Sequence, residues 1–563
     1  MANTAASNYL SAARTWLEQD PDATTRAELE PIITAAEGGD AAALADLDSR
    51  FSTRLEFGTA GLRGELGAGS ARMNRVLVAQ AAAGLAAFLV ARGESPLDGS
   101  SPSIVIGYDG RVNSRVFAED TAEIMAGAGV RAILLPRLLP TPVLAFAVRE
   151  LKTSAGVMVT ASHNPAADNG YKVYLGDYDH GSQIVPPVDG EIAAEIVAAA
   201  ARDIRDLPRS TAYETADDTV LDEYIRRTAE LAGDISNPPV FVYTAMHGVG
   251  WETAKRVFAD AGFGEPVVVA DQIEPDATFP TVAFPNPEEP GALDLAIATA
   301  VKAGADLVVA NDPDADRLAI AIPEADGSWR RLSGNEIGAL LGWAAADKAQ
   351  AAGGDGTLAA SIVSSPALEE IARKYALDYV DTLTGFKWIS RAGGLVYGYE
   401  EALGYLVDPE KVRDKDGISA AVEFLRIVTA LKAAGTSIQD HQRAFDDKFG
   451  AYASSQISIR VSDLSDIPRI MDALRNDRPR AIGSIDVLSV DDFTAGFGGF
   501  PPSDILRFHL DGKGRIIVRP SGTEPKLKVY IDASSTNGDA ANRRAEADAT
   551  VAELDRAMRA LLA

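Results

Sequence analysis

Cysteine is absent from the 563-residue chain, and histidine occurs only five times. The lack of cysteine excludes disulfide bonds, zinc sites built on thiolates and a cysteine nucleophile. Positive charge is also scarce, because 53 lysines and arginines stand against 81 aspartates and glutamates and leave a formal net charge of −28. This field opposes non-specific binding to nucleic acid, so an anionic ligand needs a local cationic cluster.

Long apolar runs are lacking as well, and the first twenty residues have neither a basic segment nor an apolar core of a signal peptide. We therefore expect no membrane partner and a cytoplasmic location. Hydrophobic residues make up 47% and charged residues 24%, which is typical of a soluble globular protein. At roughly 150 residues per domain, the length of the chain predicts three or four domains. The sequence does not indicate an oligomeric state.

Apolar strand-like runs alternate with helical segments through most of the chain, which predicts mainly parallel sheets covered by helices. The expected strands are 103–108, 132–135, 156–159, 240–243, 267–270, 306–310, 318–322, 358–363 and 395–399. After residue 450 strands follow one another closely, at 456–461, 484–490, 505–510, 515–518 and 527–531, before a helix at 540–562. We predict three α/β domains, 1–205, 206–317 and 318–449, and an α+β domain with an antiparallel sheet, 450–563.

The first loop with possible chemistry is VTASHNP, Val159–Pro165, at the end of a predicted strand. Ligands of parallel sheets bind beyond the carboxyl ends of the strands, which is where Ser162 falls. A serine here is usually a turn or cap residue, and its surroundings, TASHN with Ala161 and His163 as direct neighbours, are not the GxSxG pattern of a hydrolase. Taken alone, the loop leaves a nucleophile and a structural serine open.

The second loop is NDPDADR, Asn311–Arg317, directly after another strand. Asp312, Asp314 and Asp316 alternate and can converge on one cation, and carboxylate oxygens suit Mg²⁺ or Ca²⁺. A calcium-binding EF-hand is excluded, since its glycine and glutamate positions hold Arg317 and Pro323. Three carboxylates around Mg²⁺ leave places for phosphate oxygens; the alternative is a solvated acidic turn.

Two further loops carry polar groups. In YGYEEALGY, Tyr397–Tyr405, the adjacent Glu400 and Glu401 suit hydroxyl donors of a sugar, although an exposed charged turn is equally compatible. In RPSGTEPK, Arg519–Lys526, the forked donors of Arg519, the hydroxyls of Ser521 and Thr523 and the amides around Gly522 favour a phosphate site over a plain hairpin turn.

Together the four loops resemble those of the α-D-phosphohexomutase superfamily, in the family's order and about one per predicted domain. TASHNP resembles its phosphoserine loop, DPDADR its magnesium loop, YEEA its sugar-binding loop and RPSGT its phosphate-binding loop. Four shorter segments agree: FGTAGLRG (Phe57–Gly64), DNGYKVY (Asp168–Tyr174), TLTGFK (Thr382–Lys387) and VRDKDG (Val412–Gly417). The resemblance implies four domains around a central cleft, three related mixed or parallel α/β units and a C-terminal α+β domain.

The resemblance also implies a mechanism. A phosphorylated Ser162, bound with Asp312, Asp314 and Asp316 to Mg²⁺, would donate its phosphoryl group to a sugar monophosphate and recover the other group from the resulting 1,6-bisphosphate. Catalytic residues would then be Ser162, Arg63, Lys172 and His163, the last two as candidates for proton exchange. Substrate-binding residues would be Arg317, Thr384, Gly385, Glu400, Glu401, Ala402, Lys415, Arg519, Ser521, Gly522 and Thr523.

One departure from the family bears on the substrate. Many phosphoglucomutases have glutamate, glutamate and serine in the sugar loop, whereas this chain has Ala402 in the third place. That variant, with KLKVY (Lys526–Tyr530), resembles a branch that includes phosphopentomutases. Our first hypothesis is interconversion of glucose 1-phosphate and glucose 6-phosphate with glucose 1,6-bisphosphate as activator; mannose, ribose and deoxyribose phosphates stay alternatives. A phosphoserine-dependent phosphatase and a non-catalytic sugar-phosphate-binding protein are the rivals from other classes.

Overall fold

The computed structural model describes residues 2–57, 61–461, 463, 465–521 and 526–562. Contacts divide the chain into two compact units. Unit 1 consists of the residues up to 332 together with 404–426, and unit 2 of 333–403 and the residues from 427 onward. Each unit has cores and loops of its own and is described by itself.

The first sheet of unit 1 has the order β1-β5-β4-β2-β3-β7. Its strands are β1 (Leu62–Glu65), β2 (Ser103–Tyr108), β3 (Arg131–Leu134), β4 (Ala155–Val159), β5 (Asp168–Leu175), β7 (Glu214–Thr215) and the short β6 (Ser182–Gln183), which pairs with β5. β2 runs parallel to β3 and β4, whereas β5 is antiparallel to both β4 and β1. The sheet is therefore mixed rather than mainly parallel, because the chain turns back as a hairpin after β4.

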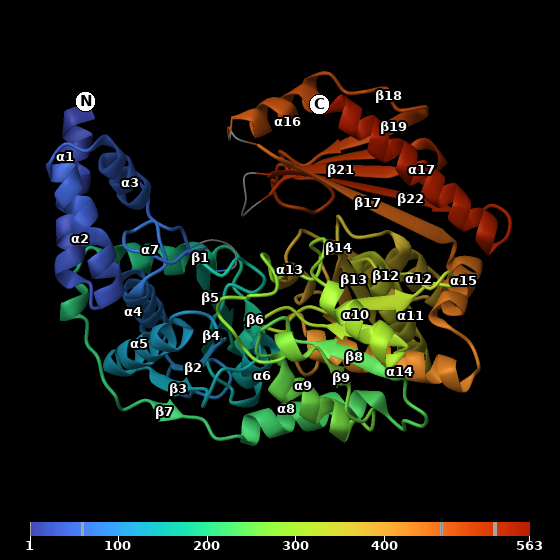
Figure 1. Cartoon of the computed structure of the whole chain (residues 1–563), viewed down its shortest axis with the longest axis horizontal. Coiled ribbons are helices and arrows are strands. Elements are labelled where there is room, and N and C mark those ends of the chain that lie inside the picture. Colours follow the sequence, from blue (N-terminus) through green and yellow to red (C-terminus); the bar gives the residue numbers. More distant parts are fainter. Residues whose placement is uncertain (1, 58–60, 462, 464, 522–525, 563) are drawn as a thin grey trace. The chain divides into compact units, whose positions relative to one another are not determined.

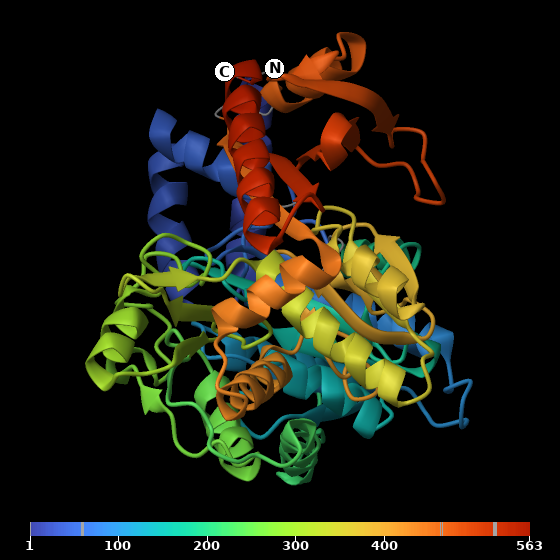
Figure 2. The ribbon, with the colours of Figure 1, turned by 90° about the vertical axis from the view of Figure 1, so that its right-hand side faces the viewer.

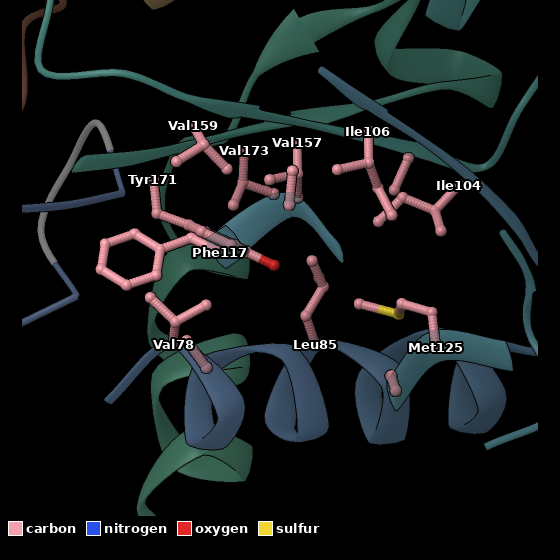
Figure 3. Close-up of a cluster of buried hydrophobic side chains, with 14 of the residues drawn as sticks. Val78, Leu85, Ile104, Ile106, Phe117, Met125, Val157, Val159, Tyr171 and Val173 are labelled. Atoms are coloured by element: carbon pink, nitrogen blue, oxygen red, sulfur yellow. The ribbon is translucent and has the colours of Figure 1, made fainter. Parts of the chain in front are cut away.

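Helices cover both faces of this sheet: α4 (Arg75–Arg92), α5 (Ser114–Gly127) and α7 (Val188–Ala200) on one, and α6 (Thr141–Glu150) on the other (Figure 1). Side chains alternate along each strand, so Ile104 and Ile106 of β2 face the α4 side (Figure 3). There they meet Val78 and Leu85 of α4, which point toward the strands. This core supports the strand ends that carry Ser162.

Helix α4 is the one helix of the described residues that is long and apolar enough to cross a membrane, which the sequence expectation did not single out. In the structure 61% of it is buried, as in the core helix of a globular domain. It also packs on α1 (Ala2–Gln19), α2 (Ala23–Glu37) and α3 (Ala41–Phe51) through residues such as Leu29 and Leu47. The aspartates Asp22 and Asp40 cap α2 and α3.

The second sheet of unit 1 has the order β12-β11-β10-β8-β9. Its strands are β8 (Phe241–Thr244), β9 (Val267–Val268), β10 (Leu307–Ala310), β11 (Ala319–Pro323) and β12 (Trp329–Arg331), with α8 (Thr219–Ala229), α9 (Gly250–Asp260) and α10 (Asp294–Ala303) beside them. β11 pairs antiparallel with β10, so the strand predicted at 318–322 belongs to this sheet and not to the third α/β domain. The four domain limits otherwise stay predictions.

Residues 404–426 return from the third α/β region to unit 1. Gly404, at the start of β16 (Gly404–Leu406), forms a bridge with Arg317. Asp414 accepts hydrogen bonds from the Tyr174 hydroxyl at 2.8 Å and from Gln183 at 2.6 Å. We call residues 404–426 the return segment.

Unit 2 begins with a parallel arrangement in which β13 (Thr357–Ser361) lies between β14 (Asp378–Thr382) and β15 (Leu395–Glu400). Its helices are α11 (Gly334–Ala351), α12 (Ala367–Tyr375), α13 (Phe386–Ile389) and α15 (Ile438–Phe449), and α14 (Gly417–Ala433) leads into it. Gly334 allows α11 to start against the carbonyl oxygen of Glu401, which an added Cβ would meet at 1.8 Å.

The C-terminal sheet of unit 2 is antiparallel, in the order β17-β22-β21-β20-β19-β18. Its strands are β17 (Ala451–Arg460), β18 (Ala481–Ile482), β19 (Ile485–Asp492), β20 (Leu506–Leu510), β21 (Arg515–Pro520) and β22 (Lys526–Ser535). The helices α16 (Asp466–Asn476) and α17 (Ala540–Leu561) pack on it. Figure 1 shows α17 along β17 and β22, and Figure 2 shows the same helix in red, ending at the C-terminus. The antiparallel α+β character agrees with the sequence prediction.

Candidate active site

Ser162 lies in the tight turn after β4 and is 3% exposed. Its backbone is left-handed, with φ of 51°, a conformation that costs about 1–2 kcal/mol for a residue other than glycine. The amide of Ser162 donates to Thr160 Oγ1 at 2.8 Å, which fixes the turn. Its hydroxyl donates to Asp312 Oδ2 at 2.9 Å and lies 3.2 Å from His163 Nδ1. The structure thus brings the serine loop and the aspartate loop into direct contact.

Arg111, which was not predicted from the sequence, binds backbone carbonyl oxygens of the serine loop. One terminal nitrogen donates to the carbonyl oxygens of Pro165 and Asp168 at 2.7 and 3.0 Å. The other donates to those of Ser162 and Asn164, each at 2.6 Å. The one sequence feature that could have indicated Arg111 is its position just beyond the end of β2. In the structure β2 lies beside β4, the strand that leads to Ser162.

The three aspartates predicted as metal ligands stand between β10 and β11 and are fully buried. Their ligand atoms lie within 4.8 Å of one another. Gly248 lets the neighbouring loop approach closely, since an added Cβ would meet the Pro313 backbone at 2.2 Å. Thr141, at the start of α6, donates to Asp314 Oδ2 at 2.6 Å.

Cationic side chains surround the aspartates. Lys172 comes from β5, whose hairpin with β4 places its Nζ 2.7 Å from Asp314 and 2.8 Å from Asp316. Lys415 of the return segment lies 3.4 Å from Asp316. Arg317 donates its amide to Asp312 Oδ1 at 3.0 Å. Predicted residues from three separate segments, Lys172, Lys415 and residues 312–317, are therefore gathered at one point of unit 1.

Burial and charge set the protonation of this cluster. Burial, followed by the charges of Asp314 and Asp316, raises the pKa of Asp312 well above its ordinary value. Burial alone would also raise the pKa of Asp316, but Lys172 and Lys415 outweigh it and lower that pKa. Burial opposes the charge of Lys172, and the two carboxylates outweigh it and raise the ammonium pKa. Asp314, Asp316 and Lys172 thus hold one another charged, whereas Asp312 favours its protonated form.

His163 and Arg63 complete the surroundings of the serine. Burial, with the charges of Arg317 and Arg63, lowers the pKa of His163 well below its ordinary value, so the ring is neutral at pH 7. Arg63 lies on β1, which pairs with β5, and donates to Asn164 Oδ1 at 3.2 Å. A neutral imidazole beside the hydroxyl suits proton exchange, and a guanidinium in contact with the serine loop suits anion binding.

The sugar loop of unit 2 follows β15. Glu401 Oε2 accepts hydrogen bonds from Ser361 at 2.9 Å and from Ser364 at 3.1 Å, both at the end of β13. The Glu401 amide also donates to Ser364 Oγ at 3.1 Å. Glu400 and Ala402 flank it and are half-buried. The serines fix the orientation of the Glu401 carboxylate.

The phosphate loop of unit 2 follows β21. Arg519 donates to Thr384 Oγ1 at 2.6 Å, which joins two segments predicted to bind substrate. Its Nε is buried and, among the described residues, has no hydrogen-bond partner. Gly385, with φ of 108°, precedes α13. The Ser521 amide donates to Lys526 at 2.8 Å, whereas Gly522 and Thr523 lie outside the described residues.

Four family models match the chain in succession. They are the α/β/α domains I, II and III of phosphoglucomutase/phosphomannomutase, at residues 54–203, 222–327 and 333–446, and its C-terminal domain at 457–550. The chain belongs to the phosphoglucomutase/phosphomannomutase family. It is a phosphosugar mutase of the α-D-phosphohexomutase superfamily, an isomerase that moves phosphate within a sugar.

Individual relatives of this phosphomutase carry different substrate names. It is 56% identical over 490 residues to a "probable phosphomannomutase" of Haemophilus influenzae, covering 87% of this chain and 98% of the relative. It is 34% identical to the human phosphopentomutase, covering 93% and 91%. A solved phosphoglucomutase/phosphomannomutase family protein from Burkholderia thailandensis shares the fold, with a TM-score of 0.67, 21% identity and coverage of 90% and 98%.

The aspartate cluster of the phosphomutase fits a divalent cation. Among the described residues Asp314 Oδ1 and Asp316 Oδ1 are buried without a hydrogen-bond partner. Unpaired buried carboxylate oxygens are costly, and a cation bound by oxygen ligands would satisfy both. Asp312 and Ser162 Oγ stand beside them, so the ligand set predicted from the sequence is assembled within unit 1.

Proposed function

We propose that this phosphomutase interconverts the 1- and 5-phosphates of ribose and deoxyribose through a phosphorylated Ser162 and a sugar bisphosphate. The relatives named for pentose or ribose phosphates, which cover more than 90% of this chain, support this substrate class better than our first hypothesis of glucose. Ala402 supports it independently. Positions 400–402 offer two carboxylates and no hydroxyl. Ribose 1-phosphate has two ring hydroxyls besides the one that accepts phosphate, whereas glucose 1-phosphate has three.

The reaction begins with phosphate on Ser162. The sugar hydroxyl attacks phosphorus, the bond from phosphorus to Ser162 Oγ breaks, and the proton of the hydroxyl leaves to a base. The intermediate then presents its other phosphate: Ser162 Oγ attacks phosphorus, the bond from phosphorus to the sugar oxygen breaks, the base returns its proton to that oxygen, and the isomeric monophosphate departs. A bound Mg²⁺ would supply electrostatic stabilisation of the charge on the transferred group.

Residues of unit 1 take the remaining roles of this step. Asp312, Asp314 and Asp316 would hold Mg²⁺, while Arg63 and Arg317 add positive charge beside the serine. Proton exchange falls to His163, which is neutral and 3.2 Å from Ser162 Oγ, or to Lys172, which is charged. Lys415 keeps Asp316 charged.

Residues of unit 2 bind the sugar. Glu400 and Glu401 would accept hydrogen bonds from ring hydroxyls, and Glu401 is already oriented by two serines. Arg519, Ser521, Gly522 and Thr523 would bind the phosphate that is not being transferred, with Thr384 and Gly385 beside them.

The test is a comparison of ribose, deoxyribose, mannose and glucose 1-phosphates with Mg²⁺ and a catalytic amount of glucose 1,6-bisphosphate. We expect the highest kcat/KM for the pentose phosphates, with phosphate retained in the product. A higher value for a hexose phosphate would overturn the pentose assignment. Release of inorganic phosphate without isomerisation would identify a phosphatase.

Ser162→Ala is the matched variant for the same assay. It should lose both turnover and the phosphorylated peptide that contains residue 162, because no other hydroxyl contacts Asp312 Oδ2 in the described site. Full turnover by this variant would reject Ser162 as the phosphoryl carrier. A mannose phosphate mutase is the second candidate, favoured by the relative that is 56% identical.

A further inference from the structure

One face of β21 contacts two loops of the third α/β region, both within unit 2. Side chains of a strand alternate between faces, so Arg515, Ile517 and Arg519 point the same way. Arg515 contacts the loop after β13, Ile517 packs on the same loop, and Arg519 reaches Thr384 after β14. The strand therefore connects the sugar loop region at one end with the phosphate loop at the other.

Arg515 is fixed on this face by a row of polar neighbours. It pairs in register with Asp532 of β22, and Asp532 pairs with Ser454 of β17. Asp532 Oδ2 accepts hydrogen bonds from Arg515 at 2.6 and 3.2 Å, and Asp532 Oδ1 accepts one from Ser454 at 2.7 Å. Ser454 in turn accepts from Asn335 of α11 at 3.0 Å.

The guanidinium of Arg515, fixed by Asp532, is linked to the sugar loop through Ser364. One of its nitrogens donates to the carbonyl oxygen of Ser364. Ser364 is the residue whose hydroxyl binds the Glu401 carboxylate and accepts the Glu401 amide. Arg515 thus lies two contacts away from the carboxylate that is proposed to bind sugar hydroxyls, and it does not touch that carboxylate itself.

Apolar packing keeps the two layers in contact. Ile517 and Tyr530, which face each other across β21 and β22, form one cluster with Ile362 and Val363, directly before Ser364. All four are 4% exposed or less. The loop after β13 is therefore held by apolar contacts in the middle and by Arg515 at its end.

We propose that Arg515 is a positioning residue that sets the orientation of Glu401 through Ser364 and so couples the C-terminal sheet to sugar binding. The role of Glu401 in this inference rests on the proposed function. The planar fork of arginine serves Asp532 and the Ser364 carbonyl together, whereas a lysine ammonium has no such fixed geometry.

The experiment compares Arg515→Lys, Glu401→Gln and the double variant in steady-state kinetics. It uses whichever sugar phosphate the unmodified enzyme turns over best, so a wrong pentose assignment does not affect it. We expect Arg515→Lys to raise KM on the order of tenfold with a smaller change in kcat, since it disturbs binding and not the serine chemistry. In the Glu401→Gln background the same change should have less than a twofold effect.

Arg544→Lys is the matched control. Arg544 of α17 also joins a buried aspartate, Asp446, at 2.6 Å and a backbone carbonyl, that of Tyr452, at 2.7 Å, in the same unit. It should leave KM unchanged. Fully multiplicative effects of Arg515→Lys and Glu401→Gln would overturn the proposal, as would an equal rise of KM in the control. Failure of every sugar phosphate to isomerise would instead overturn the proposed function.

Discussion

Arg111 shows how much a single side chain contributes to the serine loop. Its two terminal nitrogens bind four carbonyl oxygens of residues 162–168, while Asp109 lies 3.5 Å from its Nε. Both terminal nitrogens of Arg111 donate to backbone carbonyl oxygens of the serine loop. Its charge can therefore affect a bound anion only at a distance, and not by a direct hydrogen bond from these nitrogens. The hydrogen bonds to the backbone maintain the left-handed conformation of Ser162, which is unfavourable for a residue with a side chain.

Arg111→Lys should therefore lower kcat on the order of 100-fold, because an ammonium group cannot bind four carbonyl oxygens at once and the hydroxyl would be misplaced. The measurement is kcat together with the phosphorylation of Ser162 by a bisphosphate. Arg115→Lys, an exposed arginine paired with Glu119, is the control and should retain full activity. Guanidinium added to Arg111→Ala should restore part of the rate; an unchanged rate in Arg111→Lys would contradict the role.

At the scale of elements, the sequence predicted what apolar patterns determine. Strands rich in β-branched residues, such as β2 and β10, were found where expected. β5 was missed, because Asn169, Gly170 and Lys172 do not favour strands and only the pairing with β4 and β1 makes one. β11 was assigned to the wrong sheet, because chain order does not reveal which edge a strand joins.

The candidate site divides in the same way, into residues that a sequence motif marks and residues whose contacts only the fold creates. Ser162 and the aspartates form recognisable motifs, but they follow strands of two different sheets, and their contact depends on how those sheets pack within unit 1. Arg111 and Arg515 act on backbone carbonyls, which every residue has, so no spacing in the sequence marks their partners. Such residues emerge only when the fold brings distant segments together.

Helices α11 and α15 provide a prediction on pH. His441 of α15 stacks on Trp343 of α11, with ring centroids 4.4 Å apart. Burial lowers the pKa of His441 from its ordinary value of 6.5, against an opposing effect of Asp347. The unfolded chain therefore binds this proton more readily, and the stabilisation that is fully present above pH 6.5 is lost progressively as the pH falls from 6.5 through the lower pKa of the folded state.

His441→Phe should reduce the drop in melting temperature between pH 7.5 and pH 5.5, because phenylalanine keeps the stacking and cannot take up a proton. Thermal unfolding of both proteins at the two pH values measures it. The comparison is internal, since the remaining histidines are the same in both. An identical drop would show that His441 does not contribute.

At the scale of the whole molecule, every predicted metal ligand lies in unit 1 and the C-terminal sheet lies in unit 2. The units have separate hydrophobic cores, so local opening in one need not involve the other. Binding of a cation to the native state stabilises the region that holds it.

Mg²⁺ alone should consequently slow hydrogen exchange in residues 307–323 and in the return segment, and leave β17 and β22 unchanged. Mass spectrometry of hydrogen exchange with and without Mg²⁺ checks this. Asp314→Asn, which removes one ligand, should abolish the effect. Protection confined to unit 2 would place the cation elsewhere.

The return segment also has a consequence for biosynthesis. Unit 1 cannot be completed when the ribosome has made residue 332, because Lys415 and Asp414 are still missing from Asp316 and Tyr174. The third α/β region must be translated first, and at roughly 5–20 residues per second this takes several seconds. Throughout that interval the nascent aspartate cluster lacks one of its cations, so a nascent chain stalled at residue 332 should be more susceptible to protease than one stalled well beyond residue 426.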